Sequence, residues 1–225
     1  MLWQVPRLWE GGRCFILGGG PSMPRQFGVP EELITEVLQG ADPSLYSPYF
    51  KPIHKEHVIG VNMAIKLGDW IDVMFFGDDN FWNVRKYEII NYKGIRTTII
   101  DKAKREIPSK IKLLKRDPKK VGISKNKSML CWNFNSGSAA INLAVHFGAK
   151  QIILLGFDMK LDKSSNQHWH KYYYSGKAVQ SNFRKHLESF PQIAADAKQM
   201  GIEILNANPD SRIDNFPKVS LKEVL

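Results

Sequence analysis

The sequence predicts an α/β fold with a doubly wound, mostly parallel sheet, formed by a single domain that covers residues 1–225. Short apolar segments bounded by glycine or polar residues alternate along the chain with longer amphipathic segments, which is the order of strands and helices in such a sheet. A hydrophobic content of 43% is enough for a sizeable core and argues against disorder. Two additions to the sheet are expected, a basic insertion at about 102–127 and a lid segment at about 161–176.

The first half of the chain predicts four strands. Residues 1–12 look like an irregular arm, and the apolar run Cys14–Leu17 reads as a strand buried on both faces. A helix is expected from Gly28 to about Gln39, because Pro30 and two acidic residues suit its first turn. Residues 41–52 predict a loop. A short helical turn at 64–68 and a helix at 81–91 separate the other strands, which are His57–Asn62, Ile71–Phe76 and Arg96–Ile100.

The second half begins with the basic segment Lys102–Lys127, whose lack of periodicity predicts an excursion from the sheet. The helix Ala139–Phe147 has Asn135, Ser136 and Ser138 as N-cap candidates. The polar and aromatic stretch Leu161–Gly176 lies between a strand and a helix, where lids occur. The remaining elements are strands at Gln151–Leu155 and Gly201–Asn206, one helix at Lys177–Met200 or two broken near Pro191, and a short capped helix at Ser220–Leu225.

Charge and cysteine content narrow the class of protein. The net charge is +10, and the basic segment carries eleven Lys or Arg against two acids, which is +9. Such a segment can bind an acidic glycan or an anionic membrane surface, or it can be a solvated loop; its few aromatic residues argue against nucleic acid. There is no apolar run of the ~18 residues that span a membrane, no signal-peptide pattern, and only Cys14 and Cys131 as thiols. We therefore expect a cytoplasmic protein, with peripheral membrane contact left open.

Polar and small residues follow several predicted strands. Gly18–Ser22, Asn62, the pair Asp78-Asp79 and Asp158 each come directly after a strand, and the helix start Asn135–Ser138 faces the same edge. In a Rossmann-like sheet, ligands bind at the carboxyl ends of the strands, so we expect one pocket there. The bare glycine turn lets backbone N–H groups approach a phosphate, although a tight turn that binds nothing is the alternative. Neither G-x-G-x-x-G nor G-x-x-x-x-G-K-S/T occurs at this turn.

Short motifs between Cys14 and Ser211 resemble those of the bacterial CMP-sialic-acid-dependent sialyltransferase-like clan. This clan includes motility-associated glycosyltransferases and 6-hydroxymethylpterin diphosphokinase-like proteins. Gly18–Ser22 is similar to the clan's G-N-G-P-S, with Gly19 in place of Asn, and Leu155–Asp158 is similar to S-G-I-D-F. The other matching stretches are Val61-Asn62, Asn135–Gly137, the histidines of His168–Ser175, and Asn206–Ser211.

The resemblance implies a glycosyltransferase that uses a nucleotide-sugar donor, without a metal cofactor, to modify a bacterial or phage surface glycan; homo-oligomers are left open. A lid histidine would be the general base, and we favour His170 over His168 because it lies nearer the next helix. Lys160 stands where the clan has Tyr, and would neutralise the leaving phosphate together with Tyr172 or Tyr174. The implied nucleotide-binding residues are Gly18, Gly19, Gly20, Ser22, Asn62, Asn135, Ser136, Gly137 and Asp158.

The pair Asp78-Asp79 keeps other functions open. Two acids at a strand end suit Mg²⁺ with a nucleoside triphosphate, which favours a phosphoryl or diphosphoryl transferase of the pterin-kinase type. Capping of the following helix is the simpler explanation for the same residues. A nucleotide-binding protein without turnover is a third reading, and a metal on His168 and His170 ranks below these. The other histidines, His54, His57, His146 and His186, are expected to be structural.

Overall fold

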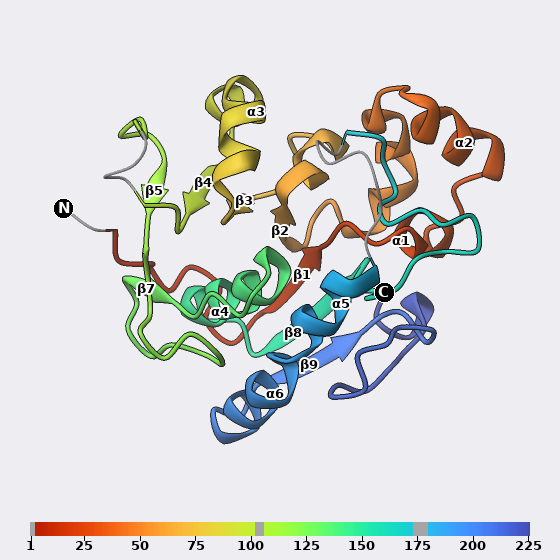
Figure 1. Ribbon diagram of the computed structural model, residues 1–225. Helices are drawn as coiled ribbons and strands as arrows, with labels where there is room; N and C mark the ends of the chain where they lie inside the picture. The colour runs from red at the N-terminus through yellow and green to blue at the C-terminus, as the bar shows by residue number, and fades with distance from the viewer. Residues whose placement is uncertain (1–2, 102–105, 173–179) are drawn as a thin grey trace.

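The computed structural model describes residues 3–101, 106–172 and 180–225, and it is built around one parallel sheet (Figure 1). Seven strands lie in the order β5-β4-β3-β2-β1-β8-β9, and every pair is parallel. This confirms the predicted doubly wound α/β fold. The strands are β1 Arg13–Leu17, β2 His57–Val61, β3 Val73–Phe76, β4 Ile95–Thr98, β5 Lys112–Leu113, β8 Gln151–Leu155 and β9 Glu203–Asn206.

Strand β1 lies at the centre, where the direction of winding reverses. From β1 the chain steps outward through β2, β3, β4 and β5 on one side, and it returns to β8 and β9 on the other side. Cys14 is in register with His57 of β2 and with Ile152 of β8. In such a sheet the connections leave β1 and β8 in opposite directions, so a crevice opens outside their carboxyl ends.

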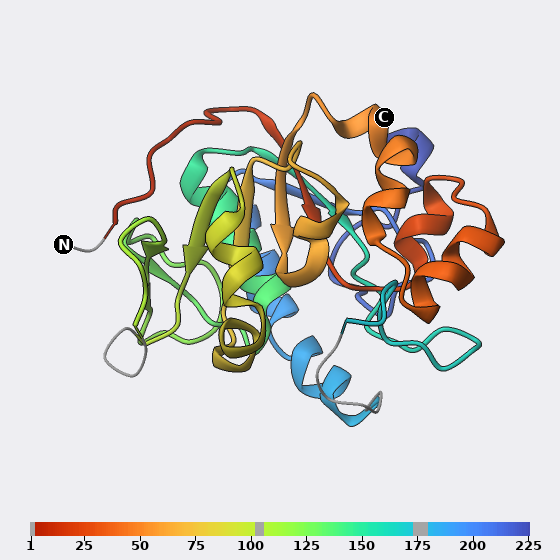
Figure 2. The same cartoon turned by 90° about the horizontal axis from the view of Figure 1, so that it is seen from above.

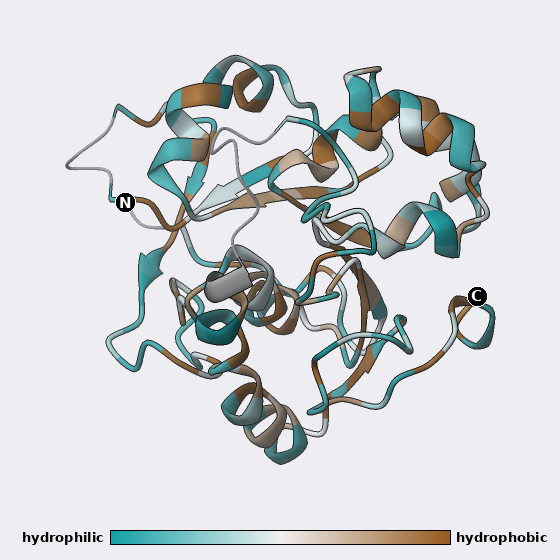
Figure 3. Cartoon of the chain, turned by 45° about the vertical axis from the view of Figure 1, so that its right-hand side comes forward, coloured by the Kyte–Doolittle hydropathy of each residue, from teal (hydrophilic) through white to brown (hydrophobic). Residues whose placement is uncertain are grey.

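The two faces of the sheet carry separate apolar cores because side chains alternate along each strand. Cys14 and Ile16 of β1 belong to the core under α4 (Ser136–Phe147) and α6 (Phe190–Gln199). Phe15 and Leu17 belong to the opposite core, under α2 (Glu31–Gln39) and α3 (Asp79–Asn91). Figure 2 shows these two helical layers on either side of the strands, and Figure 3 shows the apolar colouring of the central strands. None of the helices in the described residues is long and apolar enough to cross a bilayer.

The predicted loop at 41–52 is wrong, since Pro43–Ile53 forms the 3₁₀ helix η1. The Asp42 carboxylate accepts a hydrogen bond from the Ser44 amide at 2.8 Å and caps it. Tyr46, Phe50 and Ile53 are buried on one side of η1, so tertiary packing holds a proline-rich segment in helical turns. The sequence reading also missed the short helix α1 (Ser22–Gln26), whereas η2 (Asn62–Leu67) lies near the predicted turn.

Over the described residues 106–127, the basic segment lies outside the main sheet except for β5 and packs against the domain. β5 extends the main sheet as its edge strand, and β6 (Lys115–Arg116) pairs with β7 (Met129–Leu130). The buried Asn142 side chain of α4 accepts hydrogen bonds from the amides of Ser124 (2.8 Å) and Cys131 (3.0 Å). These buried polar anchors fix the segment that periodicity alone could not place. Residues 102–105 lie outside the described residues.

The C-terminal elements follow the sequence closely. The helical stretch before β9 is broken as expected, into α5 (Gln180–Leu187) and α6, with Pro191 in the first turn of α6. The tail forms the 3₁₀ helix η4 (Leu221–Glu223), in which Ser220 and Glu223 make a capping box. Residues 173–179, which include the start of the predicted helix, lie outside the described residues.

Candidate active site

A cavity of about 210 Å³ opens at the carboxyl edge of the sheet, at the β1–β8 reversal. The glycine turn and the start of α4 both line it, as the expected common edge of the sheet requires. The predicted site residues that line it are Gly18, Gly19, Gly20, Asn62, Asp78, Asn135, Ser136, Gly137, Asp158, Lys160, His168, His170 and Tyr172. Tyr174 lies outside the described residues, and Ser22 and Asp79 are not part of the lining.

The glycine turn is packed against protein, which differs from the expected bare phosphate cradle. A Cβ atom on Gly18 would lie 2.7 Å from the Gly156 carbonyl oxygen, and one on Gly20 would lie 2.6 Å from both that oxygen and the Asp158 carboxyl. A Cβ on Gly19 would lie 2.6 Å from Nδ1 of His168. The amides of Gly18 and Gly20 donate to β8 and its following turn at 2.8 Å. The glycines therefore permit close contact between two neighbouring strand ends.

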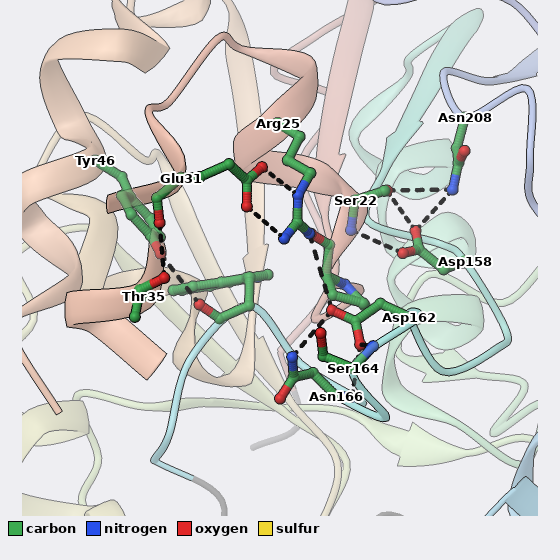
Figure 4. Close-up of polar contacts among 12 residues, drawn as sticks. Ser22, Arg25, Glu31, Thr35, Tyr46, Asp158, Asp162, Ser164, Asn166 and Asn208 are labelled. Carbon is green, nitrogen blue, oxygen red and sulfur yellow. Dashed lines mark hydrogen bonds and ion pairs between the residues drawn. The ribbon is translucent and has the colours of Figure 1, made fainter. Parts of the chain in front are cut away.

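Ser22 acts beneath the cavity by binding Asp158 (Figure 4). The Ser22 amide and hydroxyl donate to the Asp158 carboxylate at 2.9 and 2.6 Å, and the Asn208 side-chain amide donates to it at 2.9 Å. Burial raises the pKa of Asp158, while these hydrogen bonds oppose the rise. One carboxylate thus joins the chain segments that follow β1, β8 and β9, and it fixes the floor of the site.

The start of α4 leaves backbone donors directed at the cavity. Asn135 caps the helix by accepting a hydrogen bond from the Ser138 amide at 2.8 Å. Ser136 and Gly137 form the first turn, which contains no acidic residue. A Cβ on Gly137 would lie 2.9 Å from the Phe157 ring, so glycine also allows this approach. The positive end of the dipole and the N–H groups of this turn suit an anion such as a phosphate.

Strained backbone is concentrated around the cavity. Three of its non-glycine lining residues have positive φ angles, namely Asn62 (53°), Phe134 (59°) and Met159 (52°). Each such residue costs about 1–3 kcal/mol and persists only where the surroundings enforce it, as at functional sites. The Asn62 Oδ1 atom is also buried without a hydrogen-bond partner among the described residues. This buried acceptor could take a hydrogen bond from a donor that enters the cavity.

The lid histidines rest on the glycine turn. Nδ1 of His168 lies 3.3 Å from the Gly19 carbonyl oxygen, and the buried Trp169 indole donates to the Gly18 carbonyl at 2.9 Å. The rings of His168 and His170 stack with centroids 5.3 Å apart, so alternation places them on one face as expected. Four lid residues, Gln167, His168, His170 and Tyr172, therefore form a wall of the cavity. The position of the lid between a strand and a helix also predicts that Gln167–Tyr174 is mobile without ligand and closes over a bound nucleotide, and this stays a prediction.

Hydrogen bonding distinguishes the two imidazoles. A carbonyl oxygen only accepts, so we infer that Nδ1 of His168 carries the proton and that Nε2 carries the lone pair. The Tyr172 amide donates to Nδ1 of His170 at 3.2 Å, which places the proton of His170 on Nε2. Burial lowers the pKa of His168 to about 4 and that of His170 well below its ordinary value. Both rings are therefore neutral near pH 7.

Sequence reasoning missed the aromatic lining of the cavity. His186, expected to be structural, also lines it, and burial lowers its pKa. The missed aromatic side chains lie in turns and on helix faces where apolar residues also occur for packing. Their residue type alone therefore could not predict that they line a cavity. The missed aromatic residues are Phe81, Trp132, Phe134, Phe157 and Phe183.

The acid pair is explained by helix capping. The Asp78 carboxylate accepts a hydrogen bond from the Asn80 amide at 2.7 Å at the start of α3, and Asp79 is outside the lining. No group of three or more His, Cys, Asp or Glu side chains that could hold a metal ion occurs in the described ranges. Capping therefore accounts for the position of Asp78, and a magnesium site on the two carboxylates stays a prediction of the phosphoryl-transfer alternative.

The fold is shared with a known enzyme. No family model matches the sequence, and no curated protein matches it. The structure of MAf glycosyltransferase from Magnetospirillum magneticum superimposes with a TM-score of 0.61 at 12% identity, covering 100% of this chain. This chain spans 36% of that protein's length. The sialyltransferase CstII from Campylobacter jejuni, in complex with cytidine-5′-monophosphate, gives a TM-score of 0.49 at 12% identity over 92% of this chain and 84% of that one. The first likeness establishes that the two proteins share this α/β fold, and the pterin-kinase part of the resemblance remains unsupported.

Proposed function

We propose that this protein transfers a sugar from a nucleotide-sugar donor, of the CMP-sialic-acid type, to a hydroxyl of an acceptor glycan. One juxtaposition carries the proposal: a helix start with open N–H groups and a neutral imidazole face the same cavity. Glycosyl transfer needs both, because the leaving phosphate must be stabilised while the acceptor hydroxyl loses a proton. The fold shared with a glycosyltransferase supports the same reading.

In this proposal the nucleotide phosphate binds at the start of α4. The amides of Ser136 and Gly137 donate to its oxygens, and Lys160 on the cavity wall neutralises the charge that develops on leaving. Tyr172 can add a hydrogen bond only if its hydroxyl leaves the Gly40 carbonyl, to which it donates at 3.3 Å. Asn62 Oδ1 can only accept, so it suits a ribose hydroxyl better than a phosphate. The chain thus supplies positive charge at the leaving group from its own residues.

The tautomers favour His168 as the base, which reverses the preference drawn from the sequence. The acceptor oxygen forms a bond to the anomeric carbon, the bond from that carbon to the phosphate oxygen breaks with its electron pair, and the proton moves to Nε2 of His168. Bound phosphate raises the proton affinity of this imidazole from its low value in the empty cavity. His170 would donate its Nε2 proton to a substrate oxygen as a positioning hydrogen bond.

The acceptor and the place of the reaction in the cell are proposed from the resemblance to the sialyltransferase-like clan. We propose a bacterial or phage surface glycan as acceptor, reached from the cytoplasm or from the membrane surface. Formation of homo-oligomers is also part of this proposal.

A nucleotide panel tests the proposal. Thermal shifts are measured with CMP, CDP, GDP, UDP and ATP, each with and without Mg²⁺. CMP is expected to stabilise the protein without metal, whereas a preference for ATP with Mg²⁺ would favour the phosphoryl-transfer alternative. If none of the nucleotides shifts the melting temperature, the proposed function is wrong.

Introducing a negative charge at the start of α4 tests whether the nucleotide phosphate binds there. Ser136→Asp puts an acid in the first turn of α4, where it suits the helix dipole but repels an anionic ligand. Because Ser136 is buried, the variant is expected to melt somewhat lower than the wild type, and it should lose the CMP-dependent shift. Gln199→Glu, at the exposed end of α6, makes the same charge change away from the cavity and should keep the shift.

A further inference from the structure

The described end of the lid is held by two helices, α2 and α3. Nζ of Lys171 donates to the Gln39 carbonyl of α2 at 3.1 Å. The Tyr172 hydroxyl donates at 3.3 Å to the carbonyl of Gly40, which ends the same helix. From α3, the Arg85 guanidinium donates to the Tyr172 carbonyl at 3.0 Å and lies 5.4 Å from the centroid of the Tyr172 ring. Contacts to the carbonyl, the ring and the hydroxyl therefore fix Tyr172, whatever movement the rest of the lid makes.

Arg85 occupies a break in α3. Its φ and ψ angles of −120° and 15° are not helical, although the residues on both sides of it belong to the helix. Nη1 of Arg85 donates to Oε1 of Glu88 at 3.2 Å, while Nη2 makes the bond to the Tyr172 carbonyl. The rigid fork of a guanidinium can serve two such acceptors at once, and the Arg85 side chain is only 20% exposed. Arg85 thus joins its own helix to the lid.

Tyr172 in turn fixes the proton of His170. The Tyr172 amide donates to Nδ1 of His170 at 3.2 Å, so Nδ1 is the acceptor and Nε2 carries the hydrogen. Burial lowers the pKa of His170 most, and the neighbouring His168 and Arg85 lower it further, so the ring is neutral. In this form Nε2 can donate a hydrogen bond to a ligand in the cavity, and in the other tautomer it cannot.

We infer that Arg85 is a positioning residue, which fixes Tyr172 and through it keeps His170 in the tautomer that donates from Nε2. Arg85 is not one of the described residues that line the cavity, so it acts from behind the lid wall without touching the substrate. The effect on the tautomer is a property of the chain alone. Its consequence for turnover rests on the proposed function, in which His170 donates to a substrate oxygen. The two effects can therefore be measured separately.

¹⁵N NMR of histidine-labelled protein measures the tautomer, with His170→Gln used to assign the His170 resonances. The two ring nitrogens resonate far apart in a fixed tautomer, and exchange between tautomers brings their resonances together. The wild type is expected to show a fixed Nε2–H form of His170. Arg85→Met removes the donors but keeps a long apolar side chain, so it should shift both resonances of His170.

A matched control removes a cation from the neighbouring position of the same helix. Lys86 is exposed, and its Nζ lies 5.2 Å from the centroid of the Tyr87 ring. Lys86→Met should therefore leave the His170 resonances where the wild type has them. Arg85→Gln is a second test variant in case the break in α3 does not tolerate methionine, because its shorter polar side chain also loses the reach to Tyr172.

Turnover tests the consequence, with CMP-N-acetylneuraminate as donor and lactose as acceptor. Arg85→Met is expected to lower kcat roughly three- to tenfold, the effect of losing one hydrogen bond in the transition state. The KM for the donor should stay within about twofold, because the interaction with His170 is needed in the reaction and the nucleotide is bound elsewhere. In a His170→Gln background, Arg85→Met should cause no further loss of kcat, since both residues act through one chain of contacts.

Three results would overturn the role of Arg85. The first is averaged His170 resonances already in the wild type, and the second is an Arg85 variant whose His170 resonances do not move or move no more than those of Lys86→Met. The third is a pair of additive losses in the double variant, which would mean that Arg85 acts independently of His170. Absence of turnover by the wild type would count against the proposed function alone, because the NMR comparison still decides the role of Arg85.

Discussion

The glycine turn and the start of α4 looked alike in the sequence and differ in the structure. Both place small residues at the carboxyl edge of the sheet, and both line the cavity. In the turn, the amides of Gly18 and Gly20 are already bonded and protein atoms occupy the space beside each glycine. In the helix start, capping by Asn135 leaves the first-turn amides available. A glycine cluster therefore signals close approach without revealing whether the neighbour is a ligand or the chain itself.

The largest expected effect is the loss of turnover when His168 is replaced. It tests whether the turn region acts in catalysis while the helix start acts in binding. His168 rests on Gly19, so His168→Gln should lower turnover by roughly 10²–10⁴-fold, the usual contribution of a general base. CMP affinity should change little, because the proposed phosphate site lies at the start of α4. Steady-state kinetics and calorimetry measure the two quantities. A variant that keeps wild-type turnover would remove His168 from the chemistry, and His170→Gln is the paired comparison.

Acid should destabilise the turn region through the same histidine. Burial lowers the pKa of His168 to about 4 from an ordinary 6.5, so between these values the unfolded chain binds a proton that the folded chain does not. Stability is thus retained above pH 6.5 and falls as the pH drops toward 4. Unfolding by urea at pH 7.5 and 4.5 should show that His168→Gln loses roughly 2–3 kcal/mol less than the wild type over this range. Equal losses in both proteins would contradict the buried neutral imidazole.

Adding one methyl group to each region should destabilise the glycine turn more than the helix start. Gly20→Ala places a Cβ against the Asp158 carboxyl and the Gly156 backbone, and is expected to cost about 2 kcal/mol of unfolding free energy. Gly137→Ala would place a Cβ 2.9 Å from the Phe157 ring and 3.3 Å from Oδ1 of Asn135, but it gains about 1 kcal/mol of helix propensity, so its loss of stability should be smaller than that of Gly20→Ala. Urea denaturation compares the two. Equal destabilisation would show that the turn is no more tightly packed than the helix start.

The smallest expected effect concerns the cap of the helix start. Asn135→Ala removes the bond to the Ser138 amide and should lower the unfolding free energy by about 1 kcal/mol. CMP should restore part of this loss, because a bound phosphate stabilises the same end of the helix. Melting curves with and without CMP test this. A CMP-induced shift no larger than that of the wild type would argue against phosphate binding at α4.

Much of the fold was predictable because buried parallel strands read as short apolar runs. The runs at Cys14–Leu17 and Gln151–Leu155 match β1 and β8 within one residue. Residues 43–53 were misread because Pro48 and Pro52 are typical of loops, and only the burial of Tyr46 and Phe50 explains the 3₁₀ helix. Tertiary packing of this kind overrides local propensity.

Site residues could be predicted where polar residues directly follow a strand. They could not be predicted where a strained backbone conformation brings a side chain to the cavity. Asn62 and the start of α4 could be read from their positions at strand and helix ends. Positive φ angles at Phe134 and Met159 leave no mark in the residue type, so these lining residues could not be found. Arg116 is one of many basic residues in the sequence, and nothing in that pattern predicts that it stacks on the Trp132 ring.

The hydrogen bond from Trp169 to Gly18 also bears on the order in which the molecule folds. Its two residues are 151 positions apart in the sequence, and the bonds between Ser22 and Asp158 span 136 positions. Contacts of such long range form late, because a large loop must close before they can be made. A growing chain that ends before residue 169 has the glycine turn and the start of α4 but lacks the wall between them. CMP should therefore protect the whole chain from proteolysis and leave such a fragment unprotected.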